Sequence, residues 1–159
     1  MRKIMINQVA KNILPSDLNF LDLEQLAQVE FTSECREYPV ESALLLTDDS
    51  STGWQAASSG EQTIRIVFDQ PRIVEHIFLV IDEQQQSRTQ EFILCWLMDK
   101  ESAYRELLRQ QYHFSPPDTT REIEHYEVRL DQVKTLELRI MPDINGGEAR
   151  AKLKQLRLA

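Results

Sequence analysis

The sequence predicts an all-β fold, a sandwich or barrel built from short strands. Two observations support this prediction. From Thr63 onward, apolar residues recur at every second position in short runs, which is the period of a half-buried strand. Between these runs lie stretches of turn-forming residues: DQPR, SPPDTT, LDQVK and PDINGG. Several short strands separated by such turns are typical of sandwiches and barrels.

The beginning of the chain has a different character. The stretch SDLNFLDLEQLAQ offers Ser16 or Asp22 as a helix N-cap, and Gln25 follows Asp22 by three residues, as in a capping box. We therefore expect residues 1–27 to form an N-terminal extension that is partly helical. The β domain is expected to span residues 28–159 and to begin with a strand in QVEFTSE.

The middle of the chain contains the most apolar strands. The run TIRIVF places Ile64, Ile66 and Phe68 on one face of a strand and polar or smaller residues on the other. The runs HIFLVID and EFILCWL are more continuously apolar, as expected of central strands that are covered on both faces. The intervening EQQQS is polar and is expected to form a loop.

The segment DKESAYRELLRQQYHFSP is ambiguous between helix and strand. Tyr104, Leu108 and Tyr112 fit a helical stripe, whereas Tyr112 and Phe114 also fit the alternation of a strand. Local propensity favours a helix in its first half. The surrounding β pattern favours a strand from about Arg105 to Phe114, and we predict the strand.

The last third of the chain alternates clearly. Two runs, EHYEVRL and TLELRIMP, each place every second residue on an inward face. The inward residues are Tyr126, Val128 and Leu130 in the first run and Leu136, Leu138 and Ile140 in the second. Pro142 is expected to end the second run. The C-terminal RAKLKQLR reads as one more half-buried strand.

Charge and hydropathy narrow the range of functions. The net charge of −8 argues against binding to a phosphate backbone, which requires a basic face. The longest apolar runs are far shorter than the roughly 18 residues of a membrane span. Asn7 and Lys11 interrupt any signal-peptide core. We therefore expect a cytoplasmic protein with no nucleic-acid or membrane partner.

The residue types that carry catalysis or bind metals are not arranged in known motifs. Cys35 and Cys95 are expected to be reduced, with Cys95 acting as a small buried hydrophobe. The histidines His76, His113 and His125 do not have the spacing of metal ligands. Nucleophile elbows, phosphate loops and dinucleotide fingerprints are absent from the sequence. We expect a protein that is not an enzyme and has no cofactor.

The order of these elements resembles the discoidin-type domain, the C-domain of coagulation factors V and VIII, within the galactose-binding-like jelly-roll class. The resemblance covers roughly residues 28–159. It rests on VEFTSE as a first strand, on ESALLLTDDSSTGW as a loop leading to a tryptophan, and on EQTIRIVFDQPRIVEHIFLVID as two strands around a proline-containing turn. YEVRLDQVKTLELRIMPD and ARAKLKQLRL resemble the last strands. The resemblance implies an antiparallel jelly-roll β-sandwich of about eight strands, with a ligand site in the loops at one end.

The resemblance also implies a possible calcium site, because many relatives hold calcium between the loop before the tryptophan and a glutamate on the last strand. The usual aspartate falls at Thr47 here, while Asp49 and Thr52 match two other loop positions. The glutamate falls near Gln155, and Asp48 could replace the missing aspartate by a shift of one residue. Two anionic ligands are thus absent, and calcium prefers carboxylate oxygens. We favour the alternative that the two aspartates are solvated turn residues.

Together with Asp48 and Asp49, two further residues are candidates for ligand binding. Trp54 could form a stacking platform for a sugar, although a tryptophan at the start of a strand is generally packed in the core, and we favour that role. Arg88 lies in the predicted loop QQSRTQEF, where an arginine can bind hydroxyls or carboxylates. An exposed loop arginine is more often simply solvated.

Two functions from different classes follow. The first is a non-catalytic ligand-binding module, with a carbohydrate as the expected ligand, as the resemblance implies. The second is a protein–protein interaction or assembly domain, including a possible homodimer, that uses the same sandwich without a sugar site. The shortage of aromatic residues in the predicted loops favours the second, and the resemblance favours the first.

Overall fold

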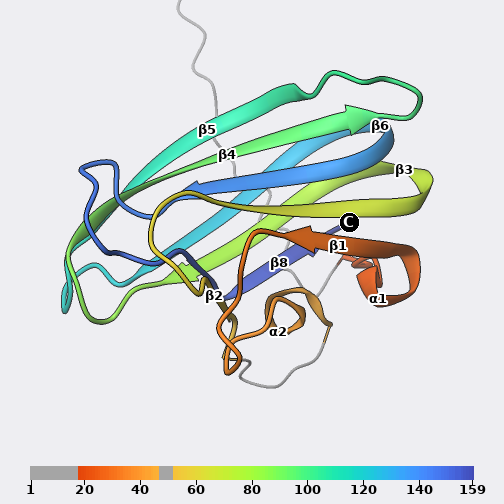
Figure 1. The fold of residues 1–159 in the computed structure, drawn as a ribbon. Helices are drawn as coiled ribbons and strands as arrows, with labels where there is room; N and C mark the ends of the chain where they lie inside the picture. The colour runs from red at the N-terminus through yellow and green to blue at the C-terminus, as the bar shows by residue number, and fades with distance from the viewer. Residues whose placement is uncertain (1–17, 47–51) are drawn as a thin grey trace, which may run out of the picture.

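The computed structural model describes residues 18–46 and 52–159, which form an antiparallel β-sandwich (Figure 1). The elements in chain order are α1 (Leu23–Leu26), β1 (Ala27–Phe31), α2 (Glu41–Leu44), β2 (Trp54–Gln55), β3 (Gln62–Asp82), β4 (Arg88–Met98), β5 (Arg105–Phe114), β6 (Arg121–Met141), β7 (Lys152–Leu153) and β8 (Gln155–Leu158). The predicted all-β jelly roll with a short helical N-terminal segment is confirmed.

The two layers share their longest strands. In the first layer, β1 pairs with the first part of β3, which pairs with the last part of β6, followed by β4 and β5. In the second layer, β8 pairs with the last part of β3, which pairs with the first part of β6. Both β3 and β6 therefore pass from one layer to the other, and Figure 1 shows them turning back at one end of the sandwich.

The two turns predicted inside these long strands are bends that leave the strands continuous. In β3 the register with β6 shifts between Val67 and His76, around the exposed Pro71. In β6 the bend contains Gln132, whose φ of 53° lies in the left-handed region. Lys134 joins the two bends, because its Nζ donates a hydrogen bond of 2.6 Å to the carbonyl oxygen of Phe68. β-Bulges of this kind increase the bend of a strand while most of its pairing continues.

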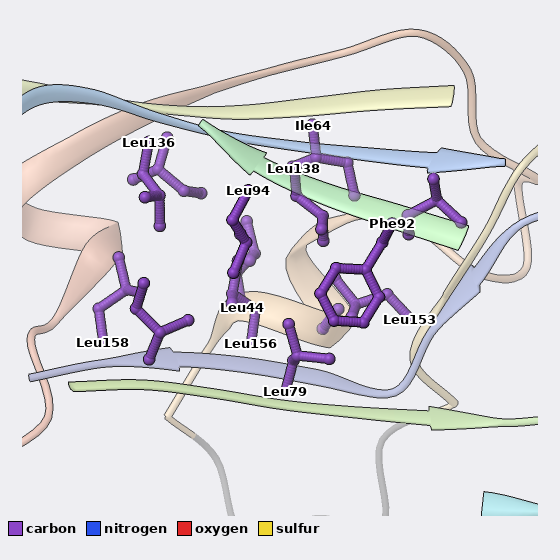
Figure 2. Close-up of a cluster of buried hydrophobic side chains, with 14 of the residues drawn as sticks. Leu44, Ile64, Leu79, Phe92, Leu94, Leu136, Leu138, Leu153, Leu156 and Leu158 are labelled. Atoms are coloured by element: carbon purple, nitrogen blue, oxygen red, sulfur yellow. The ribbon is translucent and has the colours of Figure 1, made fainter. Parts of the chain in front are cut away.

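The core lies between the two layers, where the predicted inward residues meet (Figure 2). Ile64, Leu94 and Leu138 extend from the first layer toward Leu79 and other residues of the second, and all four are buried. The alternation predicted for TIRIVF, EHYEVRL and TLELRIMP is therefore confirmed. The prediction of one half-buried strand in RAKLKQLR is wrong, because this stretch divides into β7 and β8, which pair with different strands. The outer faces of the most apolar strands, β4 and the second half of β3, are half-buried, so these strands are covered less completely than we expected.

The ambiguous segment is strand β5, which pairs with β4 along its whole length, with Arg88 opposite Phe114 and Trp96 opposite Arg105. The strand prediction is confirmed.

Two four-residue helices flank the sandwich. α1 follows Asp22 and buries Leu23, and α2 lies within the stretch predicted to be a loop. Residues 18–26 pack on the sandwich, as the hydrogen bond of 2.7 Å from the Leu21 amide to the Leu158 carbonyl shows.

The two cysteines are free, and Cys95 is buried, as predicted. Within the described ranges, no helix is long and apolar enough to cross a membrane.

Candidate functional site

A polar cleft lies at one end of the sandwich, where β3 ends and the small β2–β7 ribbon begins. We call it the end cleft; its volume is about 220 Å³, and its polar lining includes Tyr38, Thr52, Asp82, Gln84, Gln85 and Lys152. This volume is below the range of about 300–1,000 Å³ that is typical of sites for drug-sized ligands. The end cleft therefore suits a small polar ligand.

Three separate segments bring these side chains together. The loop after β3 carries Gln84 and Gln85, and both are exposed. The β2–β7 ribbon places Gln55 opposite Lys152. Tyr38 lies beside the ribbon because its backbone carbonyl oxygen accepts a hydrogen bond of 3.2 Å from the backbone N–H of Gln55.

Gly53 allows the ribbon to approach the end of the sandwich closely. Its φ is +72°, a conformation that favours glycine. A Cβ at this position would lie 2.7 Å from the carbonyl oxygen of Leu153, which is too close for any other residue without a shift of the backbone.

Beneath the end cleft lies a buried ion pair between Glu83 and Arg88, whose side chains are both fully buried. The Glu83 Oε1 accepts a hydrogen bond of 2.8 Å from Arg88 Nε, and its Oε2 accepts one of 3.1 Å from Lys152 Nζ. Arg88 Nη1 donates to the carbonyl oxygen of Pro142 at 2.7 Å. Burial raises the pKa of Glu83, but the hydrogen bonds from Arg88, from the backbone N–H of Gln85 and from Lys152 outweigh this effect. The pKa of Glu83 is therefore lower than its usual value.

The ionised Glu83 therefore holds Lys152 in place at the edge of the end cleft. The Lys152 side chain remains a quarter exposed and lines the cleft, and an ammonium group has three donors, so it can donate further hydrogen bonds there. The glutamine amides supply both donors and acceptors, and the half-buried Tyr38 ring supplies an aromatic surface. Asp82 on the same rim is already paired with Arg121 at 2.7 Å. This set of groups can bind a molecule rich in hydroxyls.

The described residues among the candidate ligand-binding set are buried. The Trp54 side chain is 1% exposed, and its Nε1 donates a hydrogen bond of 2.9 Å to the Ser33 carbonyl oxygen, so the core role that we favoured is confirmed. The expectation of an exposed loop arginine at Arg88 is wrong, because this residue begins β4 and points into the sandwich. Neither side chain offers an exposed surface for stacking or for solvent-facing contacts with a sugar.

The candidate calcium ligands are only partly described. Asp48 and Asp49 lie outside the described residues. Thr52 lines the end cleft, whereas Gln155 lies half-buried in β8 opposite Val80. In residues 18–46 and 52–159, no three His, Cys, Asp or Glu side chains surround a common point. The calcium site, and the solvated turn that we favoured over it, both stay untested predictions.

The sequence analysis named two residues that line the end cleft, Thr52 and Trp54, but it did not identify the other lining residues. The loop EQQQS was predicted, but no signal marked Gln84 or Gln85 as part of a site. Tyr38 and Lys152 are 114 positions apart and meet only through the β2–β7 ribbon. A polar loop that immediately follows a buried strand at one end of a sandwich was the one signal that could have pointed here.

A chain of buried, hydrogen-bonded side chains, Gln90 and Glu122, extends into the core from the Glu83–Arg88 pair. Gln90 accepts a hydrogen bond of 3.2 Å from Arg88 Nη1 and donates one of 3.0 Å to Glu122 Oε1. Glu122 is fully buried, and its Oε2 has no hydrogen-bond partner. Burial, together with the nearby Glu124 carboxylate, raises the pKa of Glu122 to about 8.

We expect this raised pKa to make stability depend on pH, and Glu122→Gln to remove the dependence. Between pH 4.5 and 8 the folded protein binds a proton at Glu122 that the unfolded chain does not, so the free energy of unfolding falls as the pH rises through this window. The variant should gain on the order of 2 kcal/mol relative to the wild type between pH 4.5 and 8. Urea unfolding at several pH values measures this difference. The exposed Glu148→Gln is the control, and parallel curves for Glu122→Gln and wild type would contradict the prediction.

Comparisons with known proteins identify the fold. No protein-family profile matches the sequence, and no curated protein matches it. Among solved structures, the fold is similar to the family 32 carbohydrate-binding module of C. perfringens NanJ in complex with galactose, with 11% identity, a TM-score of 0.61, and coverage of 87% of this chain and 96% of that chain. A pectin-binding carbohydrate-binding module shares 18% identity, with a TM-score of 0.57 and coverage of 84% and 90%.

A third similar structure is the module CpGH89CBM32-5 from Clostridium perfringens in complex with GalNAc-β-1,3-galactose. It shares 11% identity, with a TM-score of 0.60 and coverage of 88% of this chain and 99% of that chain. At these identities the likeness shows the fold. It confirms the jelly-roll β-sandwich fold that the order of elements in the sequence predicted.

Proposed function

We propose that this protein is a non-catalytic carbohydrate-binding module that binds its ligand in the end cleft. The observation that carries the proposal is the set of polar groups around this cleft, of which the Lys152 ammonium is held by the buried Glu83. Solved structures with the same fold include modules in complex with galactose and with GalNAc-β-1,3-galactose. The sugar identity is left to experiment.

In this proposal, the amides of Gln84 and Gln85 exchange hydrogen bonds with sugar hydroxyls. Lys152 donates to a ring or hydroxyl oxygen, while Glu83 keeps the ammonium in position. Tyr38 supplies the apolar surface that packs against the face of the sugar ring. The small volume of the cleft favours recognition of a single terminal sugar unit.

A glycan array, run with calcium and with a chelator, tests the proposal. We expect binding to one related set of glycans, and we expect Gln85→Ala to weaken it about two- to tenfold, since a hydrogen bond to a ligand is worth roughly 0.5–1.5 kcal/mol. Gln86→Ala is the matched control, because Gln86 is exposed on the same loop and does not line the cleft. Loss of glycan binding in the presence of the chelator would support a calcium ion bound by the loop that contains Asp48, Asp49 and Thr52.

A blank array for a folded protein would contradict the proposal. Equal losses for Gln85→Ala and Gln86→Ala would place the sugar outside the end cleft. The protein-interaction alternative would then be tested by measuring the mass of the protein in solution and by a search for partners.

A further inference from the structure

Two histidines that are distant in the sequence meet on the outer face of the second layer. The Nδ1 atom of His76 in β3 lies 3.0 Å from the Nε2 atom of His125 in β6. His76 pairs with Glu127 and Phe78 pairs with His125, so the two histidines are diagonal neighbours across adjacent strands. The spacing of the histidines in the sequence gave no indication of a metal site, because strand register alone brings them together.

The distance between the two nitrogens matches that of a metal chelate. Imidazole nitrogens bind zinc at about 2.0–2.1 Å. Two such ligands at an angle of about 90–110° are therefore separated by roughly 2.8–3.4 Å. The observed 3.0 Å lies inside this interval.

The two rings are also held in place before any ion binds. The His125 ring stacks on Phe78, with 3.9 Å between ring centroids and an interplanar angle of 14°. Phe20 packs edge-on against Phe78, with 5.5 Å between the ring centroids. The backbone of His76 exchanges two hydrogen bonds, of 2.9 and 3.0 Å, with Ala159. Fixed rings reduce the entropy that a metal ion would otherwise have to overcome.

We propose that His76 and His125 form a two-ligand site for a late first-row divalent cation, such as Zn²⁺, Ni²⁺ or Cu²⁺. Neutral imidazole suits these metals. In the free protein one of the two facing nitrogens donates its hydrogen to the other. On binding, that ring moves its proton to its second nitrogen through solvent, so both facing lone pairs bind the metal and no net proton is released.

The remaining coordination positions are open to water or to an external ligand. The part of the chain that the structure describes places no third His, Cys, Asp or Glu around the same point. Glu127 lies on the same outer face, directly across from His76, and adds negative charge beside the pair. The site is distinct from the end cleft, so its test is independent of the proposed function.

Calorimetric titration with ZnCl₂ and NiCl₂ tests the proposal on the full chain, free of any polyhistidine tag. All proteins carry Cys35→Ser, which removes a half-buried thiol as a competing ligand. We expect one ion per chain and at least tenfold weaker binding in His76→Gln and in His125→Gln. His113→Gln is the matched control, because His113 is an exposed histidine that shares a hydrogen bond with Thr89 across strands β4 and β5.

A spectroscopic readout separates metal binding from a purely structural role. Cu²⁺ bound to the wild type should show superhyperfine coupling to two nitrogens in its electron paramagnetic resonance spectrum, and to one nitrogen in either variant. Thermal unfolding without metal confirms that each variant is folded. Equal affinity in the His76→Gln/His125→Gln double variant and the His113→Gln control, or a single coupled nitrogen in the wild type, would overturn the proposal.

Discussion

Replacing Glu83 by glutamine is expected to lower the free energy of unfolding by about 3–5 kcal/mol, because it leaves the fully buried guanidinium of Arg88 without its counter-ion. Glutamine can still accept a hydrogen bond from Arg88 Nε, so the loss reports mainly the missing charge. The same substitution also releases Lys152 from its bond of 3.1 Å, and binding in the end cleft should weaken with it.

Chemical denaturation at neutral pH measures this loss. The exposed pair Arg109–Glu106 provides the control, since Glu106→Gln should cost no more than about 1 kcal/mol. The double variant Glu83→Gln/Arg88→Met should be more stable than Glu83→Gln alone, because it removes the unpaired charge as well. A Glu83→Gln variant as stable as the Glu106→Gln control would show that water reaches Arg88.

The contribution of the pair also has a defined dependence on pH. The folded-state pKa of Glu83 is lowered, so its contribution is fully present above the unfolded pKa of about 4.3 and is lost as the pH falls through the lower folded value. The stability difference between wild type and Glu83→Gln should therefore be constant near neutrality and shrink in acid. This direction is opposite to that expected for Glu122.

Replacing Trp54 by alanine is expected to cost about 3–5 kcal/mol, the usual loss for a large aromatic side chain in a core. The substitution also leaves the Ser33 carbonyl without its indole donor. Trp54→Phe keeps most of the ring and loses mainly the hydrogen bond, so its cost should be nearer 1 kcal/mol.

Thermal and denaturant unfolding of both variants distinguish a core residue from a sugar platform. For a core residue, Trp54→Phe should keep glycan binding while stability falls slightly. A Trp54→Ala protein that keeps wild-type stability and loses glycan binding would show that the indole faces the ligand, contrary to its burial in this structure.

The pattern of strands was predictable because alternation is a local property of an extended chain. Ile64, Ile66 and Phe68 are all buried on one face of β3, as their spacing indicated. Segment 105–114 is a strand although local propensity favours a helix at its beginning, because the edge of β4 provides hydrogen-bond partners along its whole length. The bends of β3 and β6 were read as turns, since Pro71 and its polar neighbours look the same in a turn and in a bulge.

Depth of burial was harder to predict than the direction of a side chain. Glu83 is the first residue of the polar loop EQQQS and Arg88 follows its last residue, and nothing in the sequence separates a solvated arginine from a buried one. The ion pair is buried because the ends of β3 and β4 meet beneath Lys152 and the carbonyl oxygen of Pro142. These partners lie far along the chain, so their contribution is invisible to any local pattern.

The alternating runs of the sequence were enough to predict an all-β sandwich and the core-facing residues of the strands that contain them, because the pleat of a strand sends successive side chains to opposite sides. Which residues share a site became visible only in the folded chain. His76 meets His125 across 49 positions, and Tyr38 meets Lys152 through the β2–β7 ribbon. Strand register and the bends of β3 and β6 bring these residues together, and both arise from contacts between distant parts of the chain.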